Sequence, residues 1–463
     1  AHASYLPALV PATFTETTKL AGSIGWTSVA GMLLLAYSQG GGTYTGLEAV
    51  SNNVNLLAEP RERTGKLTML YMALSLAVTA SGIILLYLLW DARPVAGETL
   101  NASTFRAIID SANLGGPVFN QVLLAVVLAF EAGLLFVAAN TGFLGGPSVL
   151  SNMASDSWVP HKFRYLSTRL VKENGILVMG VAALAILFWT RGEVKLLVVL
   201  YSLSVFLTFA ISLFGLCRYW WQSRKQSGLR WVRRFLLSLL GFVICAGILA
   251  ILLVERFAEG GWATLAIIGV IGALCVVIRN HYRETKRAIH SVDQVFANQP
   301  FGPETDSVEP DPEAQTAVFI VGSSRGGGLH ALLWVLRMFP GHFKNFIFVN
   351  ARTVDAHAYG GEDAMEDMRK EAADTLEYFV DFCQSHGMAA SSYISFGTDA
   401  VDEVTRMCEE INRTFPNSIF FTSKLIFATD NWFTRLLHNQ AALAVQRRLH
   451  LEGLQMVILP MKV

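Results

Sequence analysis

The sequence predicts a chain of two parts, an α-helical domain that crosses a membrane several times and a C-terminal cytoplasmic α/β domain with a mostly parallel sheet. Three observations predict this fold class. Apolar runs of membrane-spanning length fill the first 283 residues, basic residues concentrate in every second connecting loop, and strand and helix patterns alternate from residue 316 onward. We therefore expect a membrane domain at 1–283, an amphipathic helix and acidic linker at 284–315, and an α/β domain at 316–463.

The composition is typical of a membrane protein. Hydrophobic residues make up 52% of the chain and charged residues only 16%, whereas soluble domains average about 25% charged residues. The 36 basic and 36 acidic residues balance, so composition gives no reason to expect a nucleic-acid partner. The five cysteines show no CxxC or Cys/His spacing, so we expect neither a metal site nor a disulfide framework.

Seven apolar runs are candidates for membrane-spanning helices. Most have the roughly 20 residues that a helix needs to cross the hydrocarbon core, and the shortest needs its flanks. They cover residues 20–57, 67–90, 118–140, 175–189, 194–220, 235–254 and 262–278.

The connecting loops predict the orientation. Basic residues concentrate in "EPRERTGK", "HKFRYLSTRLVK", "RYWWQSRKQSGLRWVRR" and "RNHYRETKR", and the loops between these carry few. The basic loops and the C-terminal domain are therefore expected in the cytoplasm. An odd number of spans that starts outside, without an initiating Met or a signal-peptide pattern, leads us to expect further spans before Ala1.

The first apolar run is interrupted by "SQGGGTYTGLEAVSNN". A glycine-broken helix in lipid would leave backbone amides unpaired, so this stretch is expected to face protein or a water-filled cavity. Broken helices of this kind form the substrate and ion sites of secondary transporters. The alternative is that the glycines only allow neighbouring helices to pack closely.

Two stretches carry a family resemblance. "GTYTGLEAVSNNVNLLAEPRERTGKLTMLYMA" and "AANTGFLGGPSVLSNMASDSWVPHKF" resemble the sixth and eighth helices of the amino acid, polyamine and organocation permease superfamily. Within it, the chain is similar to bacterial amino acid permeases and to potassium importers of the potassium-uptake (KUP) type that carry a large cytoplasmic tail. The resemblance implies a LeuT-like core of two inverted five-helix repeats in a bacterial inner membrane. This chain would carry the second repeat and two accessory helices.

The resemblance also implies secondary active transport by alternating access, with H⁺ or Na⁺ as coupling ion and without a cofactor. We expect an amino acid as cargo and proton coupling, because broken-helix amides suit a carboxylate. The alternative is a potassium–proton importer regulated by a nucleotide, since backbone carbonyls, Tyr44 and a carboxylate suit a desolvated cation. A second alternative is a membrane sensor without transport, which would need neither a broken helix nor a carboxylate in the membrane.

Candidate substrate-binding residues lie in the broken helix, and the resemblance implies that their backbone lines the substrate cavity. They are Gly41, Gly42, Thr43, Tyr44, Thr45 and Gly46. Glu48 follows in the same motif and would be a gating or proton-responsive carboxylate. The alternative for Glu48 is an ordinary carboxylate satisfied at the cytoplasmic interface.

Glu131 lies near the middle of the third apolar run, in "VVLAFEAGLLF". A carboxylate at this depth costs roughly 2.5–3.5 kcal/mol to insert and is rare without a role, so we expect proton coupling or cation binding. The alternative is a protonated side chain that only packs and makes one hydrogen bond. Asn140, about two and a half turns later, is a weaker candidate for coupling, with helix capping as its alternative.

The C-terminal part alternates five strand patterns with helix patterns, which predicts a parallel α/β sheet. Its first turn, "GSSRGGG", could hold a phosphate with exposed amides at a helix N-terminus and with Arg325. The candidate regulatory residues are Gly322, Ser323, Ser324, Arg325 and Gly326. It is neither a P-loop nor a complete G-x-G-x-x-G pattern.

The domain resembles the universal-stress-protein-like tails of some of these transporters, which implies a regulatory nucleotide or, alternatively, a scaffold for a homodimer. The family's later glycine–serine nucleotide signature is not visible, and "TSKLIFATDNW" occupies that region. The histidines of this part join no G-x-S-x-G elbow and no metal-ligand spacing. We therefore expect no catalytic residues and no enzymatic activity, with membrane lipid and a small solute or ion as the partners.

Overall fold

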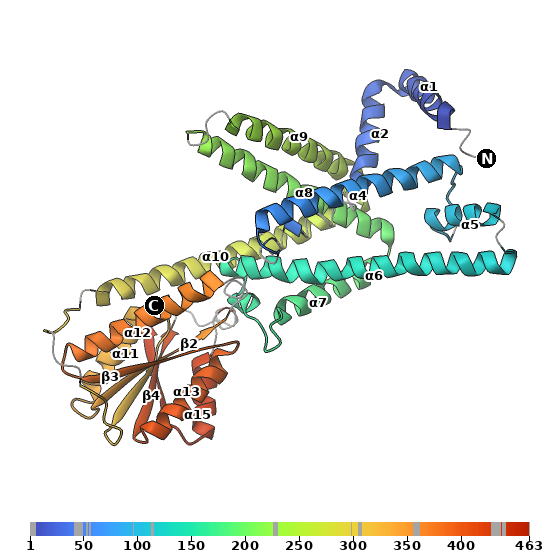
Figure 1. Ribbon diagram of the computed structural model, residues 1–463. Helices are drawn as coiled ribbons and strands as arrows, with labels where there is room; N and C mark the ends of the chain where they lie inside the picture. The colour runs from blue at the N-terminus through green and yellow to red at the C-terminus, as the bar shows by residue number, and fades with distance from the viewer. Residues whose placement is uncertain are drawn as a thin grey trace. The chain divides into compact units, whose positions relative to one another are not determined.

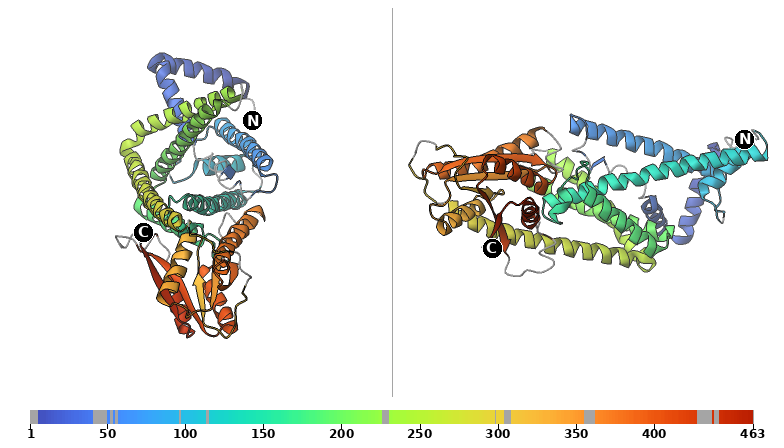
Figure 2. Two further views of the ribbon diagram at one scale, coloured as in Figure 1. Left: turned by 90° about the vertical axis from the view of Figure 1, so that its left-hand side faces the viewer. Right: turned by 90° about the horizontal axis from the view of Figure 1, so that it is seen from below.

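The computed structural model describes residues 6–40, 50–51, 54, 57–95, 97–112, 115–225, 230–297, 299–303, 308–354, 362–426, 437 and 441–462. The chain divides into two compact units, residues 1–145 with 180–271 and residues 146–179 with 272–463. The described residues up to 297 are mainly helical, and the strands of the sheet follow from residue 316 (Figures 1 and 2).

The first part of the chain is helical. Its α-helices are α1 (Leu6–Ile24), α2 (Trp26–Gln39), α4 (Arg61–Leu89), α5 (Leu100–Ala112), α6 (Pro117–Ser155), α7 (Glu173–Thr190), α8 (Val194–Gln222), α9 (Arg230–Arg256) and α10 (Trp262–Ala297). Three short turns join some of them: η4 (His161–Arg164), η5 (Ser223–Lys225) and the π-type turn η6 (Phe257–Gly261).

Five helical segments in the described part of the chain are long and apolar enough to cross a membrane. They are α4, α6, α7, α8 and a stretch from Trp231 to Phe296 that contains both α9 and α10. Their apolar side chains face outward: Leu134 and Phe136 on α6 are 71% and 72% exposed. Surfaces of this kind fit lipid rather than water. The expected first run, 20–57, contains α2, but its glycine-rich part lies outside the described residues.

The turn between α9 and α10 depends on Gly260. Its φ of +115° lies in the region that favours glycine, and a Cβ at this position would clash with the side chain of Leu196 on α8. Within this unit α8 and α9 pack along their length through Leu203, Phe206, Ile248 and Leu252, which are almost completely buried. The glycine therefore allows the chain to reverse against a well-packed helix pair.

The expected parallel α/β sheet is present. It has the strands β1 (Thr316–Ile320), β2 (Asn345–Thr353), β3 (Ala389–Gly397), β4 (Ser418–Ile426) and β5 (Met456–Lys462), all parallel and in the order β3-β2-β1-β4-β5. In the register of the central strand, Phe319 pairs with Phe348 and with Phe421.

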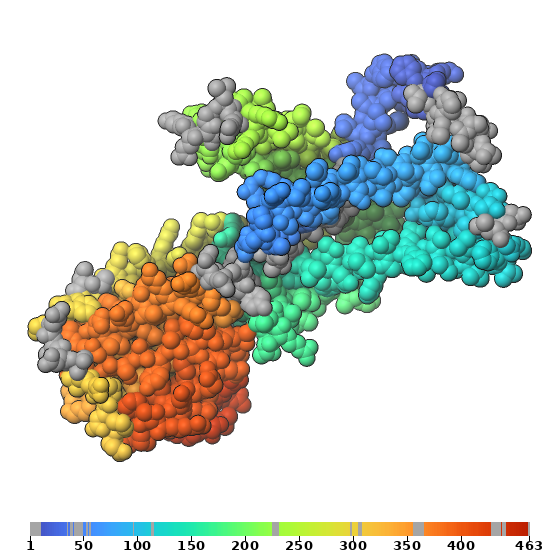
Figure 3. All heavy atoms as spheres, viewed as in Figure 1, coloured from blue at the N-terminus to red at the C-terminus, as the bar shows by residue number. Residues whose placement is uncertain are grey.

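Helices cover both faces of the sheet, because alternate residues of the central strands point to opposite sides. Phe319 packs with α11 (Arg325–Met338) and α12 (Glu362–Gln384), whereas Val318 packs with α13 (Ala400–Thr414) and α15 (Ala441–Leu451). Figure 3 shows the outer surface of this domain, drawn in orange and red.

The helix that precedes the sheet contains both the last apolar run and the charged stretch that follows it. α10 runs without interruption from Trp262 to Ala297, through the expected boundary at residue 283. The stretch "RNHYRETKRAIHSVDQVF" contains neither glycine nor proline, so nothing in it stops a helix. The helix that carries the last apolar run therefore continues directly toward the α/β domain in the sequence.

Candidate functional site

Three polar side chains from three helices meet in the helical part. The side-chain amide of Asn101 on α5 donates a hydrogen bond of 2.6 Å to Oε1 of Glu131 on α6. The hydroxyl of Tyr87 on α4 donates a hydrogen bond to Oδ1 of Asn101. All three side chains are half-buried. Glu131, the carboxylate that the sequence places in an apolar run, is therefore the last acceptor in a chain of two hydrogen bonds. We call Tyr87, Asn101 and Glu131 the polar triad.

The polar triad can act on a proton or a cation. It brings a carboxylate, an amide oxygen and a phenol oxygen together among apolar helices, where each would be costly to bury alone. Oxygen atoms of this kind replace the water shell of a desolvated alkali cation, and an intramembrane carboxylate can take up and release protons. The amide orientation also fixes Glu131 as the acceptor from Asn101.

Sequence reasoning identified Glu131 but missed its partners. Asn101 lies in "ETLNASTF", between two of the expected apolar runs, and the structure places it in α5, which begins at Leu100. α5 has 13 residues, too few to cross a membrane, and it buries Ala102 and Ile109, which lie seven residues apart on one face, as well as Thr104. That amphipathic spacing was the available signal.

Asn140 is not part of the polar triad. Asn140 lies on α6 about 13 Å beyond Glu131 at the usual helical rise, and its side chain is exposed. Gly41, Gly42, Thr43, Tyr44, Thr45, Gly46 and Glu48 lie outside the described residues.

A second cluster, which the sequence did not predict, joins the loop after α6 to α10. The ring of His161 stacks on the ring of Tyr282 with centroids 4.1 Å apart, and the Tyr282 hydroxyl donates a hydrogen bond of 2.8 Å to the carbonyl of Leu437. Burial, assisted by the nearby charge of Arg164, lowers the pKa of His161 to about 4. The imidazole is therefore neutral at pH 7.

The cap of α11 brings the expected regulatory residues together. Ser324 is the N-cap and its Oγ accepts a hydrogen bond from the amide of Gly327 at 3.0 Å. Oδ1 of Asp293, near the end of α10, accepts one hydrogen bond of 2.8 Å from Ser324 Oγ and one of 2.7 Å from the amide of Gly326. The anion position that the sequence assigned to a phosphate is thus held by a carboxylate of the same chain.

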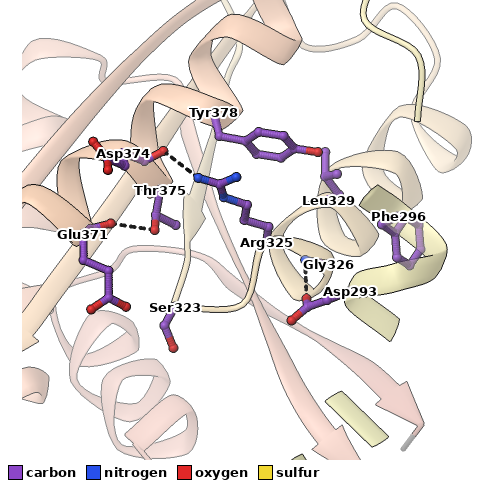
Figure 4. Close-up of a pocket in the computed structure, with 10 residues that line it drawn as sticks. All are labelled: Asp293, Phe296, Ser323, Arg325, Gly326, Leu329, Glu371, Asp374, Thr375 and Tyr378. Atoms are coloured by element: carbon purple, nitrogen blue, oxygen red, sulfur yellow. Dashed lines mark hydrogen bonds between the residues drawn. The ribbon is translucent and has the colours of Figure 1, made fainter. Parts of the chain in front are cut away.

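A pocket of about 420 Å³ lies beside this cap (Figure 4). Arg325 crosses it with its guanidinium 4.7 Å from the ring centre of Tyr378, and it donates a hydrogen bond to the carbonyl of Asp374. Burial raises the pKa of Tyr378, and the charge of Arg325 works against that rise. Ser323 also lines the pocket, whereas Gly322 is exposed beside it.

The charge of the pocket limits what it accepts in this conformation. Its acidic lining residues are Asp293, Glu371 and Asp374, and its basic lining residue is Arg325. A phosphate would meet a net negative lining, and Asp293 itself occupies the position at the helix N-terminus. Gly326 is required for the present contact, because a Cβ there would lie 2.6 Å from Oδ1 of Asp293 and 2.8 Å from its Cα.

The sequence matches no family model. Over 272 residues it is 32% identical to the potassium transporter KimA of Bacillus subtilis, in an alignment that covers 58% of this chain and 43% of that protein. The chain thus spans less than half the length of this relative. The relative is named as a transporter, in agreement with the expectation of transport rather than enzymatic activity for this chain.

Proposed function

We propose that this chain forms part of a secondary active transporter that imports potassium together with protons. The observation that carries the proposal is the 32% identity over 272 residues to a protein named as a potassium transporter. The sequence alone favoured an amino acid as cargo, and this relationship favours the potassium alternative instead. The segments long and apolar enough to cross a membrane support a multi-pass membrane protein.

The polar triad supports the same function by its chemistry. Glu131, Asn101 and Tyr87 offer oxygen atoms and no fixed positive charge, which suits a monovalent cation better than the carboxylate of an amino acid. We assign Glu131 the proton-coupling role and Asn101 the role of positioning its carboxylate. Backbone carbonyls of residues 41–46 would complete the cation path.

We extend the proposal to the fold and its regulation. The helices would form the second repeat and the accessory pair of a LeuT-like transporter, with the α/β domain in the cytoplasm of a bacterial cell. A regulatory nucleotide would bind at Gly322–Gly326, which includes Arg325. Its phosphate would replace the carboxylate of Asp293 as the acceptor of the Gly326 amide. Because Asp293 belongs to α10, its release would reach the helix that carries the last apolar run. The same domain would mediate a homodimer.

Growth at limiting potassium tests the proposal. A bacterial strain without its own potassium uptake systems would express the protein from its complete reading frame. We expect growth at micromolar potassium, lost in Glu131→Gln and retained in the control Glu255→Gln, which changes an exposed carboxylate at the end of α9. Failure to restore growth, together with restored growth of an amino acid auxotroph on its amino acid, would overturn the assignment.

A further inference from the structure

The end of the α8–α9 helix pair where the two helices are connected carries basic residues and no acidic ones. No acidic residue occurs between Glu193 and Glu255, and the basic residues of the connecting region gather within 218–234. They are Arg218, Arg224, Lys225, Arg230, Arg233 and Arg234. The side chains of Arg218, Arg224, Arg233 and Arg234 are exposed. None of these four forms an ion pair with a carboxylate in the described part of the chain.

Aromatic rings hold two of these arginines in place. The guanidinium of Arg234 lies 4.8 Å from the ring centre of Trp220, and that of Arg224 lies 5.1 Å from the ring centre of Trp221. Trp221 in turn packs edge-on against Trp231 of α9, with centroids 6.3 Å apart. A guanidinium that stacks through its face keeps the N–H groups at its edge available for an oxyanion.

The position along the helices matches the boundary of a bilayer. Arg234 and Arg256 lie on the same helix and are about 33 Å apart at the usual rise of about 1.5 Å per residue, close to the ~30 Å thickness of the hydrocarbon core. Between them, Leu237, Leu240 and Val243 expose apolar side chains. Tryptophan and arginine at one end of such a stretch correspond to the level of the lipid headgroups.

We propose that residues 218–224 and 231–235, on α8, η5 and α9, form a binding site for the headgroup of an anionic phospholipid (Figure 1). The guanidinium groups of Arg224 and Arg234, which lie over tryptophan rings, donate to the phosphate oxygens, and the tryptophans lie at the level of the glycerol backbone. An anionic lipid is preferred over a zwitterionic one because its phosphate carries no compensating ammonium, and the region supplies only positive charge. The site is independent of which ion the protein carries.

Competition between two lipids tests the proposal. The protein, purified in detergent, would be equilibrated with equal amounts of phosphatidylglycerol and phosphatidylcholine, and retained lipid would be counted by native mass spectrometry. We expect at least a fivefold preference for phosphatidylglycerol in the wild type. The double variant Arg224→Gln/Arg234→Gln should lower that preference below twofold.

Matched variants distinguish a specific lipid site from nonspecific attraction between positive charge and anionic lipid. The control Lys195→Gln/Arg256→Gln removes the same charge from the opposite end of the same helices and should stay within twofold of the wild type. Arg224→Lys/Arg234→Lys keeps the charge but loses the planar stacked fork, so it should lose two- to threefold of the preference.

Three results would overturn the site: equal retention of the two lipids by the wild type, an unchanged preference in the Gln variant, or an equal loss in the control. If the Gln variant does not elute as a folded protein, the Lys variant decides the question. An unchanged preference there rejects the site.

Discussion

The carboxylate of Asp293 accepts a hydrogen bond of 2.7 Å from the backbone amide of Gly326, so the end of α10 caps the N-terminus of α11. The contact uses the positive end of a helix for a carboxylate of the same chain. It makes the helix that carries the last apolar run a direct part of the candidate regulatory pocket.

Replacing Asp293 should loosen this cap. Asp293→Asn keeps the shape but loses the charge, and charge-assisted hydrogen bonds contribute roughly 1.5–3 kcal/mol each. We expect amide exchange at Gly326 to become at least tenfold faster by hydrogen–deuterium exchange, because a neutral amide oxygen accepts a weaker hydrogen bond from Gly326 than the carboxylate does. The control Asp381→Asn changes an exposed carboxylate on α12 and should leave exchange at Gly326 unchanged. Equal protection in wild type and Asp293→Asn would show that the carboxylate does not hold the cap.

The contact between His161 and Tyr282 should weaken in acid. The pKa of His161 is lowered to about 4 in the folded protein, whereas that of a free imidazole is about 6.5. The unfolded state therefore binds more protons between these values, and stability falls as the pH drops from about 6.5 to about 4. Between pH 7 and pH 5 the melting temperature should fall less in His161→Phe than in the wild type, because phenylalanine stacks on Tyr282 but does not titrate. The control His290→Gln, on exposed surface of α10, should behave as the wild type does. If the melting temperature of His161→Phe falls as much between pH 7 and pH 5 as that of the wild type, His161 is not the source of the acid sensitivity.

Gly260 should tolerate no side chain. Alanine there would adopt a φ of +115° and clash with Leu196, and strained backbone of this kind costs on the order of 1–3 kcal/mol. The melting temperature of Gly260→Ala in detergent should fall by several degrees. Gly269→Ala, on α10 with no atom close to the added Cβ, should not fall. Equal melting temperatures for the two variants would show that the turn adapts.

Asn101 should affect transport through its hydrogen bond to Glu131. Asn101→Ala removes the 2.6 Å hydrogen bond and leaves the carboxylate without this donor. We expect the pH dependence of uptake to shift while maximal uptake falls less than in Glu131→Gln. Measuring uptake from pH 5.5 to 8 for both variants separates positioning from coupling. A pH profile identical to that of the wild type would remove Asn101 from the account.

The parallel sheet was predictable from the sequence, because its strands are short apolar runs such as "AVFIVG" that alternate with amphipathic helices. α5 was not, since its 13 residues lie between apolar runs and have the polarity of a loop. Glu131 was predictable because it is a carboxylate in the middle of an otherwise apolar run. Its partner Asn101 was not, because the contact spans 30 residues and depends on how α5 packs against α6.

The same reason applies to the regulatory pocket. The glycine-rich turn was visible in the sequence, but the residue that fills its anion position lies 33 positions away. Asp293 was assigned to an amphipathic connecting helix, where an acidic residue usually faces solvent. Only the docking of α10 on α11 shows that the predicted phosphate position already holds a carboxylate.

The most direct test of the central claim is rubidium and potassium flux into proteoliposomes that contain the protein from its complete reading frame. With an inward proton gradient, we expect saturable accumulation of potassium, at least tenfold lower in Glu131→Gln and unchanged in Glu255→Gln. Accumulation of labelled amino acids without any potassium or rubidium flux would contradict the account.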